Sequence, residues 1–179
     1  MLRQRNRVLD EYLVVATAAG DRKGAEMLVK RWQGKLVGHA YRLTGDAEAS
    51  RDVVQAAWSE IMSGIGRLRD ERAFPAWAYR IVSRGCARHV RQIVHQRELV
   101  GAMLAEEPEA GESDPAAAVE SDRLRAAIRT LPPEQGAAIA LFYLEELSVA
   151  EVAVALDVPS GTVKTRLMHA RRKLRAVLE

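Results

Sequence analysis

The sequence is poor in the residues and patterns that build disulfide-linked, β-rich or membrane-spanning proteins. Its single cysteine, Cys86, excludes an internal disulfide framework. It has only two phenylalanines and no alternating apolar and polar runs between hairpin turns, so strand signals are nearly absent. No apolar run approaches the length of a membrane span, and residues 1–12 lack the apolar core of a signal peptide. We therefore expect a cytoplasmic protein without direct membrane insertion.

Patterns that carry catalysis or bind metals are also missing. There is no phosphate-cradling loop and no nucleophile elbow. Cys86 and His89 lie three residues apart, which is a fragment of a metal site at most. The four histidines show no metal-ligand spacing with one another: His39, His89, His95 and His169. We expect no enzyme activity, no metal or other cofactor, and no small-molecule substrate.

Positive and negative charges are segregated along the chain. Residues 1–97 hold 18 Lys and Arg against 10 Asp and Glu, and residues 98–122 hold eight acids and no base. Residues 123–179 are basic again, with nine Lys and Arg against six acids. Two basic blocks around a purely acidic stretch suggest two modules that face nucleic acid, joined by a linker.

Apolar residues recur at helical spacing through most of the chain. Residues 23–43, for example, place Leu28, Trp32, Leu36 and Ala40 on one face. The same pattern predicts further helices at 8–19, 47–63, 73 to about 104, 119–130 and 134–144, with a loop at 64–72. We therefore predict an all-α fold of two small helical domains, residues 1–100 and 119–179. An acidic, flexible linker, residues 101–118, joins them.

The last 32 residues predict a helix-turn-helix. Ser148 and Glu151 form a capping box that starts a short apolar helix. Asp157 and the following valine make the turn, and Ser160 is expected to cap the second helix. The buried stripe of that helix consists of residues at intervals of four, three and four: Val163, Leu167, Ala170 and Leu174.

The second helix of this pair carries only positively charged side chains and no acidic ones. Residues 158–178 contain six Lys and Arg and no acid. The face opposite the buried stripe carries side chains that can reach phosphates, base edges and thymine methyl groups: Lys164, Thr165, Met168, His169 and Arg172. The pattern favours DNA binding, and the alternative is a solvated basic face on an ordinary helical hairpin.

At this point the chain resembles a known family. Residues 131–178 resemble the C-terminal DNA-binding domain of bacterial RNA polymerase sigma factors of the extracytoplasmic-function (ECF) class, which have two helical domains. Residues 28–58 are similar to the helices that bind core polymerase in that family, and residues 74–92 to its promoter-melting helix. The two domains would then be a bundle like sigma region 2 and a helix-turn-helix domain like sigma region 4.

The resemblance implies partners and site residues. It implies binding to core RNA polymerase through Asp52, Val54 and Gln55, recognition of promoter DNA, and regulation by an anti-sigma factor. The implied contacts to the melted minus-ten element are Arg69, Asp70, Arg72, Arg80, Arg84, Arg88 and Arg91. Those to the duplex minus-thirty-five element are Ser160, Thr162, Lys164, Thr165, Arg166, Met168, His169, Arg171 and Arg172.

Some positions depart from the family pattern. Arg84 and Arg88 stand where members commonly have Asn and Asp, Ala56 replaces an acidic residue, and His169 replaces a frequent Arg. Two other functions compete with promoter recognition. One is a decoy that titrates an anti-sigma factor, which the retained basic helix disfavours. The other is a dimeric helix-turn-helix repressor, which the N-terminal match disfavours, so we expect a monomer outside its complexes.

Overall fold

The computed structural model describes residues 2–100 and 126–178, with side chains over 7–96 and 126–176. The described residues form helices and no strand, which confirms the all-α prediction. The N-terminal part contains α1 (Leu2–Ala18), α2 (Arg22–Thr44), α3 (Ala47–Gly64) and α4 (Phe74–Val100). The C-terminal part contains α6 (Pro133–Ile139), α7 (Val149–Leu156) and α8 (Ser160–Leu178), after a short helical stretch at 126–129. None of the described helices combines the length and the apolarity needed to cross a membrane.

Local sequence signals set these boundaries. Asp21 and Asp46 cap α2 and α3, each accepting backbone N–H bonds from the first helical turn. Gly45 ends α2 in the left-handed region, with φ 70°, which glycine adopts without steric cost. The predicted Leu28–Ala40 stripe of α2 is buried and forms the centre of the N-terminal core. A Cβ at Gly85 would lie 2.8 Å from Val53 Cγ1, so this glycine allows α4 to approach α3 closely.

Several boundaries differ from the prediction. The first helix begins at Leu2 rather than at residue 8, and the 64–72 loop contains two 3₁₀ turns, η1 (Ile65–Arg67) and η2 (Glu71–Ala73). The helix predicted at 134–144 changes to a π-helical turn, η3 (Ala140–Leu144), because its last hydrogen bonds span one residue more. The linker 101–118 and the start of the 119–130 helix lie outside the described residues.

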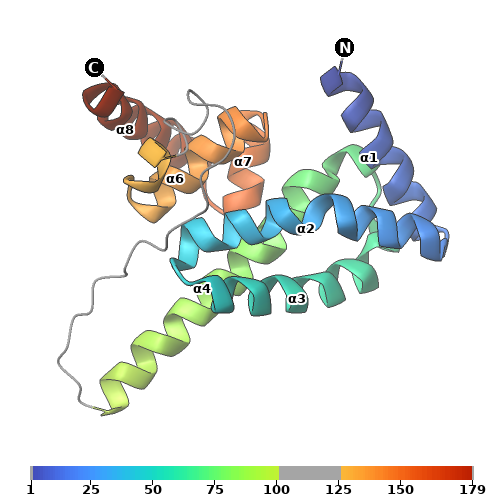
Figure 1. Cartoon of the computed structure of the whole chain (residues 1–179), viewed down its shortest axis with the longest axis horizontal. Coiled ribbons are helices and arrows are strands. Elements are labelled where there is room, and N and C mark those ends of the chain that lie inside the picture. Colours follow the sequence, from blue (N-terminus) through green and yellow to red (C-terminus); the bar gives the residue numbers. More distant parts are fainter. Residues whose placement is uncertain (1, 101–125, 179) are drawn as a thin grey trace.

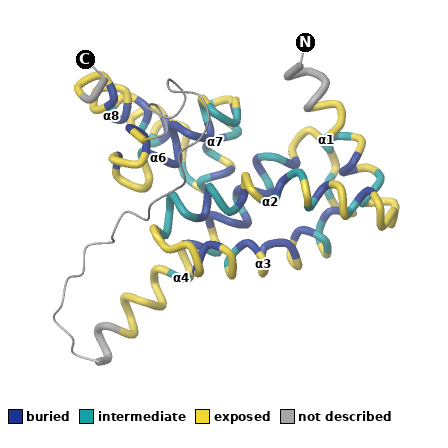
Figure 2. The backbone as a smooth tube through the Cα atoms, in the orientation of Figure 1, coloured by how far each residue is buried: buried dark blue, intermediate teal, exposed yellow. Residues whose placement is uncertain are grey.

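The two parts pack against each other. Helix α7 lies against α4, α6 lies against α2, and α8 packs on α6 and α7 at the edge of the molecule (Figure 1). Buried apolar residues of both parts form one continuous cluster. Beyond Cys86, α4 extends away from this body, and its side chains from 90 to 96 are exposed (Figure 2).

A buried histidine makes the fold sensitive to acid. His39 is fully buried, its Nε2 lies 2.8 Å from Ser83 Oγ, and its ring packs edge-on against Tyr79. Burial, with a smaller contribution from nearby Arg42, lowers the pKa of His39 from 6.5 to about 3. The folded state therefore holds the neutral imidazole, whereas the unfolded chain takes up a proton below pH 6.5. The stability from this group is complete above pH 6.5 and is lost as the pH falls toward 3.

We therefore expect the free energy of unfolding to fall by about 2 kcal/mol between pH 7 and pH 5 because of His39. Urea unfolding of the wild type and of His39→Gln at the two pH values measures this. The variant cannot take up the proton, so its stability should change less between the two pH values. An equal loss in both proteins would show that other groups cause the acid sensitivity.

Candidate nucleic-acid interface

Four arginines that the resemblance implies as contacts to the melted element form a basic stripe along α4, which is half-buried at Arg80 and exposed at the other three positions. Its four arginines, Arg80, Arg84, Arg88 and Arg91, follow one another at intervals of four, four and three, so they share one side of the helix. Arg88 and Arg91 lie on the exposed distal part of α4, where Arg91 Nε donates to the carbonyl of Ala87 at 3.1 Å. A row of guanidinium groups on an exposed helix suits a phosphate backbone.

Two arginines of the stripe have a partner in the C-terminal domain. Arg80 donates to Asp157 Oδ1 through both Nε, at 3.1 Å, and Nη2, at 2.9 Å. Arg84 Nε donates to the other carboxylate oxygen of Asp157 at 3.0 Å. These hydrogen bonds hold the pKa of Asp157 below its usual value, first through Arg84 and then through Arg80, so the carboxylate is ionised near neutral pH.

The segment 67–73, which precedes α4, places further charged side chains near the start of that helix. Asp70 caps η2 by accepting the N–H of Arg72 at 3.0 Å and also its Nε at 3.1 Å. The backbone bond from Arg72, followed by its side-chain bond, lowers the pKa of Asp70. Arg69, Asp70 and Arg72 are all exposed, so the predicted loop residues are accessible to a nucleotide.

Two aromatic residues near the start of α4, Trp77 and Tyr79, differ in exposure. Tyr79 is only 1% exposed and lies between the rings of Trp32 and His39, so its ring is not available to a base. Its burial raises its pKa well above the usual value. Trp77 is partly buried against the core and packs on Phe74.

The helix-turn-helix forms as the sequence predicts. Both bonds of the capping box are present: Ser148 N–H donates to Glu151 at 2.7 Å, and Glu151 N–H donates to Ser148 Oγ at 3.2 Å. The whole predicted stripe of α8 is buried, from Val163 to Leu174. One detail was wrong: Ser160 is the first helical residue of α8 rather than its cap, because the α8 hydrogen bonds already begin at the Pro159 carbonyl.

The predicted DNA contacts on α8 fall into two groups, those without a side-chain partner among the described residues and those that pair with another side chain of the same domain. Lys164, Thr165, Met168 and Arg172 are exposed, and Ser160 is exposed at the start of the helix. Thr162 and His169 are half-buried. This exposed group is the surface that α8 can present to a duplex.

The second group has partners in its own domain. Arg166 pairs with Glu134 at 2.5 Å, and its side chain is only 18% exposed. Arg171 donates to Tyr143 Oη at 2.9 Å and lies over the rings of Phe142 and Tyr143. Sequence reasoning missed these pairs because the partners lie 28 and 32 residues earlier in the chain.

The predicted polymerase-binding residues lie on α3, where Asp52 and Gln55 are exposed. Val54 was wrongly predicted as a contact: it is 0% exposed, because it faces inward on the apolar side of α3. Its side chain packs in the hydrophobic core under α3 and is not available to a partner.

In the part of the chain that the structure describes, neither a metal site nor a reactive thiol accompanies these surfaces. Among the described side chains, at 7–96 and 126–176, no three His, Cys, Asp or Glu residues are placed to hold a metal ion. Cys86 is buried, and burial raises its pKa to about 12, so the thiol stays protonated.

Comparisons with known proteins match both parts of the chain. The family Sigma-70 region 2 matches residues 28–97, and the family Sigma-70, region 4 matches residues 121–174. The ECF RNA polymerase sigma-E factor of Escherichia coli K12 is 31% identical, and the match covers 92% of each chain. This chain belongs to the ECF sigma factor family. The RNA polymerase sigma-H factor of Pseudomonas aeruginosa is 29% identical, and that match covers 95% of this chain and 94% of the relative.

A solved structure has the same fold. The sigma factor RpoE from Bartonella quintana, in complex with the anti-sigma factor NepR, superposes with a TM-score of 0.69 at 18% identity. The match covers 86% of this ECF sigma factor and 95% of that chain. As a member of the family, the protein directs initiation of transcription by RNA polymerase, and the decoy and repressor alternatives are not favoured.

Proposed function

We propose that this ECF sigma factor uses three surfaces to start transcription. Exposed α3 side chains, including Asp52 and Gln55, bind core polymerase. The outer face of α8 reads duplex DNA upstream, and the arginine stripe of α4 with the 67–73 loop holds the melted strand. The observation that carries this proposal is the presence of exposed basic residues on two separate helices, α4 and α8, in a chain that matches both sigma regions.

The surrounding organisation follows from the same proposal. The N-terminal domain would comprise residues 1–100 and the helix-turn-helix domain residues 119–179, with 101–118 as the tether. We expect a non-catalytic monomer that acts in the cytoplasm with RNA polymerase. The similar Bartonella quintana structure is described as a complex with an anti-sigma factor, so we expect such a partner for this chain too.

The exposed position of Lys164 on α8 leads to a specific expectation. Lys164→Ala should lower affinity for the cognate upstream element about tenfold, because a base contact by a lysine contributes about 1–3 kcal/mol of discrimination. Binding to random duplex should fall about twofold or less, since only one charge is lost. Electrophoretic mobility shifts of the polymerase-bound protein on the two DNAs measure both effects.

Lys173→Ala is the matched control, because Lys173 is also exposed on α8 but lies outside the predicted base-reading set. Its loss should weaken cognate and random DNA by the same small factor. If Lys164→Ala also weakened both DNAs equally, Lys164 would be a backbone contact and not a base-reading residue.

A further inference from the structure

The carboxylate of Asp157 lies between two arginines of the α4 stripe. It accepts three hydrogen bonds, two from Arg80 and one from Arg84, at 2.9 to 3.1 Å. Both of its oxygens are used, each by a different guanidinium group. This is the way an anionic oxygen pair, whether carboxylate or phosphate, binds neighbouring arginines.

The fold of the helix-turn-helix fixes Asp157 in this position. Asp157 is the residue that ends α7, with φ 55° in the left-handed region, and its N–H bonds back to the carbonyls of Ala153 and Val154. Glycine, asparagine and aspartate adopt this conformation more readily than most other residues. Because α7 packs along α4, the turn delivers the carboxylate to the arginines across a shallow depression that Val154 and Pro159 help to line.

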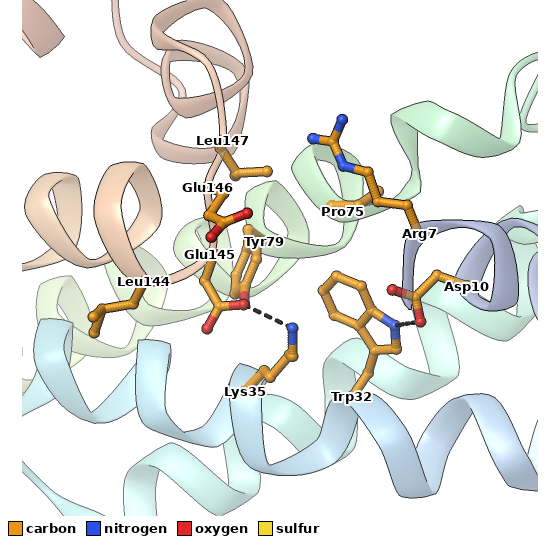
Figure 3. Close-up of a pocket in the computed structure, with 10 residues that line it drawn as sticks. All are labelled: Arg7, Asp10, Trp32, Lys35, Pro75, Tyr79, Leu144, Glu145, Glu146 and Leu147. Carbon is orange, nitrogen blue, oxygen red and sulfur yellow. Dashed lines mark hydrogen bonds and ion pairs between the residues drawn. The ribbon is translucent and has the colours of Figure 1, made fainter. Parts of the chain in front are cut away.

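Two other contacts between the domains have the same polarity. Lys35 on α2 pairs with Glu145 at 2.8 Å in a pocket between the domains (Figure 3). Arg7 on α1 lies 3.9 Å from Glu151 on α7. In each case the base belongs to the N-terminal domain and the acid to the C-terminal domain, so the interface is complementary in charge.

The contact with Asp157 affects only one of the two proposed DNA-binding surfaces, the arginine stripe of α4. Arg80 and Arg84 are engaged by Asp157, whereas Arg88 and Arg91 lie on the distal part of α4. The exposed side chains of α8 lie on a helix that packs on α6 and α7. In this state a duplex can reach α8, but a single strand that follows the stripe meets an anion at its first two positions.

We propose that Asp157 is an internal substitute for a DNA phosphate, which the melted strand must displace from Arg80 and Arg84 before it can occupy the whole stripe. The proposal rests on the proposed role of the stripe in binding that strand. The three side chains are 39% to 50% exposed, so solvent and salt weaken the contact. It therefore acts as a competitor of modest strength that polymerase and promoter together can overcome.

Fluorescence anisotropy of the full-length protein with a labelled single-stranded oligonucleotide, without polymerase and at low salt, tests this inference. Asp157→Gly should raise the affinity about fivefold, because the binding-competent state no longer competes with the internal ion pair. Glycine accepts φ 55° without strain, so the turn should fold. Asp157→Asn, which also tolerates this conformation but keeps a neutral acceptor, should give a smaller gain.

Glu60→Gln is the control for net charge, because it removes one exposed acid from α3. The gain of Asp157→Gly must exceed that of Glu60→Gln for the inference to hold. Arg88→Ala with Arg91→Ala separates the two ideas, since neither residue contacts Asp157 among the described pairs. If the Arg88→Ala, Arg91→Ala double variant weakens binding but Asp157→Gly has the same effect as Glu60→Gln, Asp157 does not compete with DNA. The role of the stripe in binding the single strand would then still hold. If the arginine pair has no effect, the role of the stripe is itself wrong.

Discussion

Asp52→Arg should reduce affinity for core RNA polymerase about thirtyfold or more and remove most promoter-directed transcription. Asp52 is an exposed acid on α3, within the residues that match sigma region 2. Reversing a charge at a complementary interface places like charges together, which costs about 2 kcal/mol or more. Co-purification with core polymerase and run-off transcription at several protein concentrations measure the loss.

The matched control is Glu26→Arg, which makes the same charge change at an exposed position on α2. It should leave polymerase binding within about twofold of the wild type, since surface substitutions away from an interface are nearly neutral. Equal losses in the two variants would indicate a general charge effect. Normal binding by Asp52→Arg would remove α3 from the polymerase interface.

Arg88→Ala with Arg91→Ala should slow promoter opening about tenfold and flatten its dependence on salt. Each phosphate contact to a single strand contributes about 0.7 to the slope of log K against log salt, so losing two should reduce the slope by about 1.4. Closed-complex binding should change little, because the proposed duplex contacts lie on α8. Permanganate footprinting of melted thymines over time, at several salt concentrations, measures both quantities.

Arg22→Ala with Lys23→Ala provides the control, because it removes the same charge from exposed positions at the start of α2. Opening kinetics in this double variant should match the wild type. A stripe variant with unchanged opening rate and unchanged salt slope would show that the distal α4 arginines do not touch the melted strand.

The sequence predicted helix starts and buried helix faces well where they depend only on residues close together in the chain. The Ser148–Glu151 capping box and the Val163–Leu174 stripe depend on residues within about three helical turns, and both are present in the structure. The whole Leu28–Ala40 face is buried for the same reason. Helical spacing alone was sufficient to place these side chains.

Long-range contacts could not be predicted in the same way. Asp157 and Arg80 are 77 residues apart, and the pair exists only because α7 packs along α4. The engagement of Arg166 by Glu134 likewise depends on how α6 meets α8. Val54 is a different case, because the resemblance alone implied it as a contact, whereas its helical spacing with Ala57 and Ile61 already places it on the buried face of α3.

The most direct test of the central claim is run-off transcription by purified core polymerase on a fragmented genomic library, with and without this protein. The account predicts discrete new start sites that appear only with the protein and share two upstream sequence elements. The Asp52→Arg variant should not produce them. Transcripts that are unchanged by a folded protein that still binds core polymerase would contradict its role as an initiation factor.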